Sequence, residues 1–269
     1  MRQIQRRAAS LVRVVGKAAR NFADAFRAGA APLERDLGLR AAPRTWAIAA
    51  TSLVLCILWL YPGKPVFYDR YLDPLLPALS SRLALEPRAL YHVLATFVLF
   101  GVVPALVVRA GFRTPLERFG IARGDLRASG AISAGALAVV LPLLYFGAAD
   151  PALRAEYPIA RRAADSAGAL LLWEACYLLY YLGWESFFRG YMLFGLEAAI
   201  GPFAANLLQT FASTLVHAGK PASETLAAAA AGMLFGAAAL RTRSILAPLA
   251  THYALGAAND IFCVLRGGP

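Results

Sequence analysis

Two histidines and one carboxylate stand inside strongly hydrophobic stretches of this chain. Glu185 lies in the segment GWESFFRGYM, four residues before Arg189. His217 and His252 occur in two later apolar segments. An ionisable side chain in such a segment must face a partner or a water-filled cavity, because an isolated buried charge is costly. These residues therefore predict one polar site assembled from three helices.

Other polar residues accompany them at helical spacing, which places side chains on one face of a helix. The residues that share a face with Glu185 are Glu174, Tyr177, Tyr181 and Arg189. On the last apolar segment, Asn259 and Asp260 lie seven and eight residues after His252. Asn259 or Asp260 is therefore a candidate for orienting the site.

Two chemistries fit these residue types. In the first, Glu185 is a general base that deprotonates water for attack on an amide, and a histidine stabilises the oxyanion. In the second, His217, His252 and Glu185 bind one divalent metal such as zinc, which activates the water. The chain has no HExxH, so its signal for a metal is weak. The structural alternative is a Glu185–Arg189 ion pair with two hydrogen-bonded histidines.

The composition places these residues in a membrane. The 269 residues are 59% hydrophobic and only 16% charged, with a mean hydropathy of +0.55. A soluble domain carries about 25% charged residues. We therefore expect an all-α transmembrane bundle of about seven to eight spans, each near the roughly 20 residues that cross a bilayer. The expected spans are 45–61, 90–109, 130–148, 167–189, 202–217, 224–240 and 244–265. The piece 190–201 either completes the fourth of these helices or lies along the interface.

The charges predict how the spans are oriented. The net charge is +11, and arginines crowd residues 1–44 and recur in the loop 110–129. This pattern is typical of the cytoplasmic side of a membrane protein and argues against nucleic-acid binding. The loops 62–89 and 149–166 balance their bases with acids and are expected outside. Residues 1–44 form either an amphipathic helix on the membrane surface or a basic tail.

Two further patterns concern packing. Gly232 and Gly236 form a GxxxG motif, which lets a neighbouring helix approach closely. The three cysteines lie in apolar runs without CxxC spacing, so neither a disulfide framework nor a thiolate zinc site is expected.

With these segments in place, the chain resembles the CAAX protease and bacteriocin-processing (CPBP, or Abi) family of intramembrane endopeptidases. The family motifs EExxxR, FxxxH and HxxxN correspond to WESFFRGYM at 184–192, to the helix ending in His217, and to His252 with the turns after it. HAGKPASE and LRTRSI also resemble a subset of the family. The resemblance covers roughly 167–265 as a catalytic core, with 45–166 as family-variable transmembrane helices.

The chain departs from the motifs at three positions, which are Trp184, Ser213 and Gly256. Trp184 stands where the family has the first glutamate, the residue to which the resemblance assigns the base. Neighbouring helical residues point about 100° apart, so Glu185 does not simply replace it. The open alternatives are that Glu185 is the base, that another acid (Glu174, Glu224 or Asp260) is the base, or that peptidase activity is lost.

The resemblance implies an intramembrane endopeptidase, glutamate- or metal-dependent, acting in C-terminal processing or sorting. The Ala/Arg-rich composition indicates a bacterial inner-membrane protein with a cytoplasmic N-terminus, so we expect a membrane-anchored protein or peptide as substrate. The alternative is a catalytically inactive relative that binds membrane peptides as an immunity or sorting protein. A small-molecule transporter is less favoured, because the chain shows no internal repeat.

Overall fold

The computed structural model describes residues 17, 20, 21, 24, 43–76 and 83–267. The chain divides into two compact units, Met1–Pro43 and Arg44–Pro269, and the second unit contains every candidate site residue. Most of the basic segment 1–44, with its expected amphipathic helix, lies outside the described residues. The described residues contain helices and connecting loops but no strand. The all-α prediction is confirmed for this part of the chain.

The long helices correspond to the predicted spans. They are α2 (Pro43–Leu60), a continuous helix of α4 (Pro87–Thr96), η3 (Phe97–Val102), α5 (Val103–Leu106) and η4 (Val107–Gly111), then α6 (Leu126–Gly147), α10 (Pro202–Leu215), α11 (Ala222–Thr242) and α12 (Leu246–Leu265). The helix that begins at Ala167 includes the piece 190–201, one of the two alternatives for that piece. It comprises α8 (Ala167–Glu185), η7 (Ser186–Phe194) and α9 (Gly195–Ile200). The short helices are α3 (Pro65–Phe67), η1 (Tyr68–Leu72), η2 (Asp73–Leu75), η5 (Leu116–Phe119), α7 (Pro151–Glu156) and η6 (Arg161–Asp165).

Helix boundaries follow from local chemistry. The Asp125 carboxylate accepts from the Ala128 N–H at 2.9 Å and caps α6. The Ser166 hydroxyl accepts from the Ala169 N–H at 3.1 Å and caps α8. At the other end of the same helical segment, Gly201 has a φ of +82° and Pro202 opens α10. The chain therefore turns sharply between the helical segment that carries Glu185 and the helix that ends just before His217.

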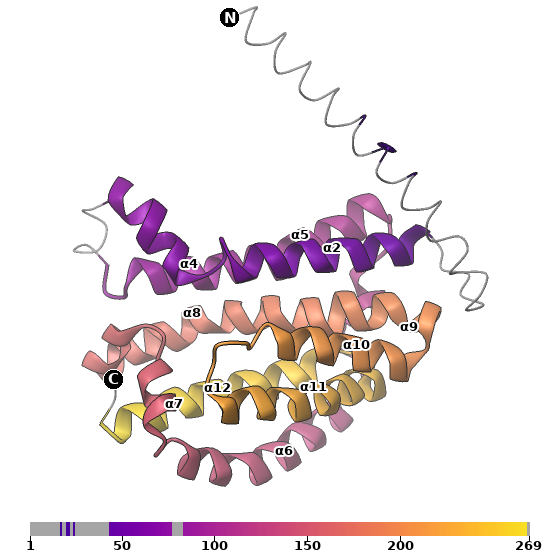
Figure 1. Ribbon diagram of the computed structural model, residues 1–269. Helices are drawn as coiled ribbons and strands as arrows, with labels where there is room; N and C mark the ends of the chain where they lie inside the picture. Colours follow the sequence, from indigo (N-terminus) through magenta and orange to yellow (C-terminus); the bar gives the residue numbers. More distant parts are fainter. Residues whose placement is uncertain (1–16, 18–19, 22–23, 25–42, 77–82, 268–269) are drawn as a thin grey trace, which may run out of the picture. The chain divides into compact units, whose positions relative to one another are not determined.

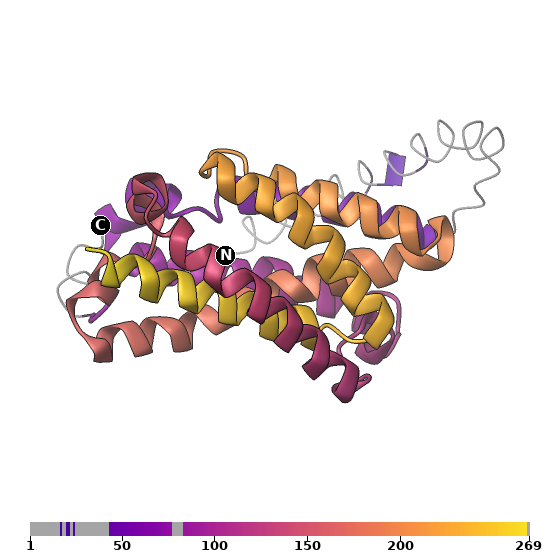
Figure 2. The ribbon, with the colours of Figure 1, turned by 90° about the horizontal axis from the view of Figure 1, so that it is seen from below.

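The helices pack on both sides of α8. In Figure 1, α2 and the 87–111 helix form a layer above α8, and α10, α11, α12 and α6 lie below it. Figure 2 shows α12 and α6 side by side, in agreement with their extensive contact. The residues of α8 and η7 thus contact helices from both halves of the chain, so a polar side chain on this element is enclosed by protein.

The α10–α11 pair confirms the expectation from the GxxxG motif. A Cβ on Gly232 would lie 2.7 Å from the Thr210 methyl group, so only glycine fits. Across this contact the Asn206 amide donates to the Met233 carbonyl at 3.0 Å, and the Gln209 amide donates to the Gly232 carbonyl at 3.1 Å. The close approach fixes the helix that ends just before His217.

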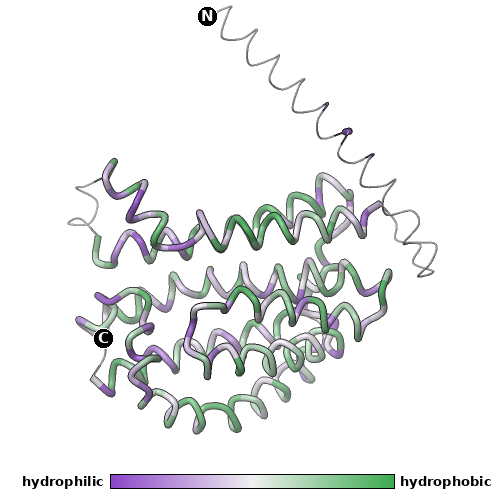
Figure 3. The backbone as a smooth tube through the Cα atoms, in the orientation of Figure 1, coloured by the Kyte–Doolittle hydropathy of each residue, from purple (hydrophilic) through white to green (hydrophobic). Residues whose placement is uncertain are grey.

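Four helices in the described residues are long and apolar enough to cross a membrane by length and composition. They are Pro43–Leu60, Pro87–Gly111, Leu126–Gly147 and Ala222–Thr242. Figure 3 shows hydrophobic residues along much of α6, where Val139, Leu143 and Phe146 are more than half exposed. Such a surface suits lipid contact. The count of seven to eight spans stays a prediction.

Candidate active site

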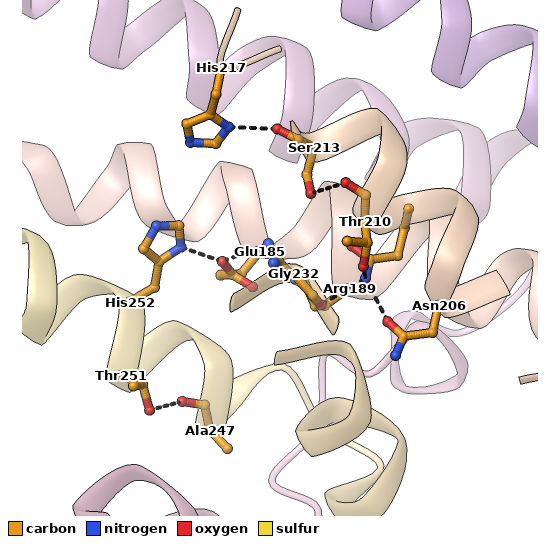
Figure 4. A network of polar contacts seen from close by, with 11 residues as sticks. Glu185, Arg189, Asn206, Thr210, Ser213, His217, Gly232, Ala247, Thr251 and His252 are labelled. Carbon is orange, nitrogen blue, oxygen red and sulfur yellow. Dashed lines mark hydrogen bonds and ion pairs between the residues drawn. The ribbon is translucent and has the colours of Figure 1, made fainter. Parts of the chain in front are cut away.

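Glu185 is fully buried at the end of α8 and connects two other helical segments. Its Oε1 accepts a hydrogen bond from Arg189 Nη1 at 3.1 Å and lies 2.6 Å from His252 Nδ1 on α12 (Figure 4). Its Oε2 is buried and has no hydrogen-bond partner in the described part of the protein. The carboxylate is therefore shared between a cation on η7 and an imidazole on α12.

Arg189 makes this arrangement possible. Its side chain is 3% exposed, and its guanidinium carbon lies 5.4 Å from the centre of the Phe235 ring on α11. Glu185 and Arg189 form the ion pair that their spacing predicts, but in the interior and with a second partner, His252. Removing one member of such a pair would leave a buried charge uncompensated.

His217 and His252 approach one another from two different helical segments. His217 Nδ1 lies 2.6 Å from the Ser213 carbonyl, so this nitrogen donates to the backbone. In Figure 4 the second ring nitrogens of His217 and His252 face one another from α10's C-terminal turn and from α12. His252 also packs edge-on against Tyr181, at 4.7 Å between ring centres. The structure thus brings His217 and His252 together, with Glu185 behind His252.

Both rings line a cavity of about 40 Å³, enough for a few water molecules. The lining residues are Trp59, Tyr157, Tyr177, Tyr180, Tyr181, Trp184, Val216, His217, Lys220, Glu224 and His252. Trp184 belongs to this wall and meets the His217 ring edge-on at 5.3 Å, whereas Glu185 does not line the cavity. Adjacent positions on α8 therefore point in different directions, as the 100° helical step predicts.

Asn259 and Asp260 lie elsewhere. Both are buried, and neither lines the cavity. The Asp260 carboxylate accepts from the Trp173 indole N–H at 2.7 Å, near the other end of α8. The structure does not bring these residues into contact with Glu185, and their expected part in orienting the site stays a prediction.

Sequence reasoning missed part of the cavity wall. Tyr157 comes from the loop after α7, and Trp59 from the last turn of α2. Neither residue lies in a motif. Trp59 is an amphipathic aromatic where an apolar segment meets a polar loop, a placement typical of a membrane interface, and that signal could have found it. Tyr157 lies in the middle of the loop 149–166, where the sequence carries no such signal.

The predicted metal ligands do not fit a metal ion in this arrangement. Glu185 contacts His252 through Nδ1, so its carboxylate and the free Nε2 lie on opposite sides of the ring. Among the described residues, no group of three His, Cys, Asp or Glu side chains is placed to hold an ion.

The comparisons with known proteins bear on the same segment. Residues 166–258 match the family model described as Type II CAAX prenyl endopeptidase Rce1-like. This segment is similar to the type II CAAX prenyl endopeptidases. The match includes Glu185, Arg189, His217 and His252, and it confirms the resemblance seen in the motifs. Together with the four candidate spans, the match supports a multi-pass membrane protein. Neither the curated proteins nor the solved structures searched gave a match.

Proposed function

We propose that the chain is an intramembrane endopeptidase that hydrolyses a peptide bond in a membrane-associated protein or peptide, in C-terminal processing or sorting. The observation that carries this proposal is that His217 and His252, from separate helical segments, line one cavity. Glu185 contacts the His252 ring from outside this cavity. The expected setting is a bacterial inner membrane with the N-terminus in the cytoplasm.

The contact with Glu185 determines which ring nitrogen of His252 carries its proton. A carboxylate accepts but does not donate, so the His252 proton is held on Nδ1 and the Nε2 side is left for the cavity. A carboxylate in this position also stabilises the imidazolium form, as in Ser–His–Asp triads. His252 can therefore supply an N–H to the oxyanion that forms when water attacks a peptide carbonyl. Arg189 holds Glu185 in place through their ion pair.

His217 has a different partner and therefore a different part. Its Nδ1 donates to a neutral backbone carbonyl, which leaves Nε2 as a hydrogen-bond acceptor toward the cavity. An acceptor there can orient the attacking water. The water's proton must still pass to a base. The sequence predicts Glu185 for this role, and Glu185 would have to exert it through His252, because its carboxylate does not line the cavity.

An assay of reconstituted protein tests the proposal. Full-length protein in proteoliposomes is given two fluorogenic probes, a farnesylated CAAX peptide and a peptide anchored by one transmembrane helix. We expect cleavage of at least one, and losses of about 100-fold or more in kcat for Glu185→Gln, His217→Ala and His252→Ala. Glu197→Gln removes a carboxylate distant from the cavity and serves as control. Full activity in both histidine variants would contradict the proposal.

One observation favours the non-catalytic alternative. Trp184 fills part of the cavity wall at the position where the motif has an acid. If the wild-type protein binds the anchored peptide without cutting it, and His217→Ala and His252→Ala abolish the binding, the chain is a membrane peptide-binding protein. The same reconstituted samples decide this, with binding measured by fluorescence anisotropy.

A further inference from the structure

The turn HAGKPASE places a carboxylate at the cavity. Glu224, in the first turn of α11, lines the cavity together with Lys220 and Tyr157. It is the one carboxylate among the described residues that line it. The turn is held in place because Lys220 N–H donates to the His217 carbonyl at 2.9 Å and the Thr225 hydroxyl donates to the same carbonyl at 3.3 Å. Glu224 is thus fixed relative to His217.

The two oxygens of Glu224 have different surroundings. Oε1 accepts from the Tyr157 hydroxyl at 2.6 Å. Lys220 Nζ donates to the same hydroxyl at 3.2 Å and forms an ion pair with Glu156. Oε2 is buried and has no hydrogen-bond partner among the described residues. One oxygen therefore orients the carboxylate, and the other has no donor among the described residues.

Tyr157 is suited to hold this carboxylate. Burial, and then the charge of Glu224, raise the pKa of the Tyr157 hydroxyl well above its usual range. The hydroxyl accordingly stays protonated and donates to Glu224, while Lys220 donates to the hydroxyl oxygen. Tyr157 is a positioning residue, because it acts on the cavity through Glu224.

The neighbouring acid on α8 lacks this access. Trp184 occupies the cavity wall on α8, and Glu185 accepts from Arg189 and His252 away from it. A general base must lie within hydrogen-bond reach of the water that it deprotonates. By this criterion the carboxylate available to a water between the two histidines comes from α11.

We propose that Glu224 is the catalytic carboxylate that takes the proton from the attacking water. The inference rests on the proposed peptidase function. One water O–H bond breaks, its proton moves to Glu224 Oε2, and the remaining hydroxide forms a bond to the carbonyl carbon. The resulting oxyanion accepts a hydrogen bond from His252. Its collapse breaks the C–N bond, and the amine takes the proton from Glu224, which regenerates the carboxylate.

Substitutions at Glu224 test this role with the same two fluorogenic probes. Glu224→Gln keeps an acceptor for Tyr157, so it preserves the fold while removing the base. We expect a loss of about 100-fold or more in kcat with little change in KM. Glu224→Asp retains a carboxylate and should recover part of kcat, whereas Tyr157→Phe should lower kcat less than Glu224→Gln. Glu197→Gln is the matched control.

The outcomes separate this inference from the proposed function. If His217→Ala and His252→Ala lose cleavage but Glu224→Gln keeps it, the Glu224 assignment is wrong and the peptidase proposal stands. A second measurement needs no cleavage: a water-soluble carbodiimide with glycine ethyl ester should modify Glu224, but not the fully buried Glu185, in detergent-solubilised full-length protein. Mass spectrometry showing Glu224 unmodified would overturn the inference.

Discussion

At the scale of single residues, the site depends on a charge balance inside the protein. Glu185 and Arg189 are both almost fully buried and 3.1 Å apart, and His252 is the only further hydrogen-bond partner of the Glu185 carboxylate in the described residues. Breaking a buried pair by removing one partner costs about 3–5 kcal/mol, whereas removing both charges together costs far less. Arg189 therefore stabilises the fold as well as orienting Glu185.

A double-substitution series measures this balance. We expect Arg189→Leu to lower the free energy of unfolding by about 3–5 kcal/mol, and Glu185→Gln combined with Arg189→Leu to recover most of that loss. Chemical unfolding in mixed micelles, followed by tryptophan fluorescence, provides the measurement. The double variant should remain inactive, because His252 then lacks its carboxylate. Equal stability of Arg189→Leu and wild type would show that the pair contributes little.

The sequence predicted the central residues of the site but not its wall. Glu185, His217 and His252 could be selected because ionisable groups in apolar segments are rare and must find partners. Which acid faces the cavity could not be predicted, because it depends on the rotation of α8 and on the path of a loop. Helical spacing put Asp260 near the face of His252, but in the structure its carboxylate accepts a hydrogen bond from Trp173.

At the scale of elements, the path of α8 depends on close contact with the 87–111 helix. A Cβ on Gly183 would lie 2.9 Å from both the Phe97 Cα and the Thr96 carbonyl oxygen. These are backbone atoms that cannot rotate away, so α8 approaches this helix closely only because residue 183 is glycine. Trp184 and Glu185 come directly after it, and the contact sets which of them meets the cavity.

Gly183→Ala should push α8 away from the 87–111 helix. We expect a destabilisation of about 1–3 kcal/mol, as for overpacked cores, with a loss of cleavage larger than the loss of folded protein. Gly168→Ala in the same helix is the control, because its nearest neighbour is the Ser166 hydroxyl at 3.9 Å. Unfolding midpoints and kcat per folded protein are measured for both. Indistinguishable variants would rule out the close contact as the reason for glycine.

The ends of helices could be predicted where the sequence has a strong helix-breaking signal, such as Pro next to Gly. Pro62-Gly63 ends α2, and the predicted spans 130–148 and 224–240 lie within a few residues of α6 and α11. Of the two alternatives for 190–201, the structure has the one in which this piece completes the helix that begins at Ala167, since the helix continues past Gly190 to the Gly201-Pro202 break. Gly190 serves a close contact instead: a Cβ there would lie 3.0 Å from the Phe119 carbonyl oxygen. A glycine's packing role cannot be distinguished from a breaking role by sequence alone.

At the scale of the whole membrane unit, the loops form two groups, and the loops within each group contact one another. At one end, Lys220 pairs with Glu156, and Arg154 donates to the Arg266 carbonyl at 2.9 Å. At the other end, Asp125 N–H donates to the Thr242 carbonyl at 3.0 Å, and Arg243 pairs with Glu197. These groups are the ones that the loop charges assign to the outside and the cytoplasm, respectively. The cavity belongs to the first group, through Tyr157, Lys220 and Glu224.

Because the cavity lies at one end of the bundle, the orientation of the protein decides on which side of the membrane the substrate is cut. If the N-terminus is cytoplasmic, the cavity lies at the outer end of the bundle. We expect Ala218→Cys, exposed beside the cavity, to react with a membrane-impermeant maleimide in spheroplasts of the expressing bacterium. Arg123→Cys, exposed in the opposite group, should react only after permeabilisation. Both are made in a background in which Cys56, Cys176 and Cys263 are replaced by alanine. The reverse labelling pattern would place the cavity on the cytoplasmic side, where it would meet substrates before rather than after their export.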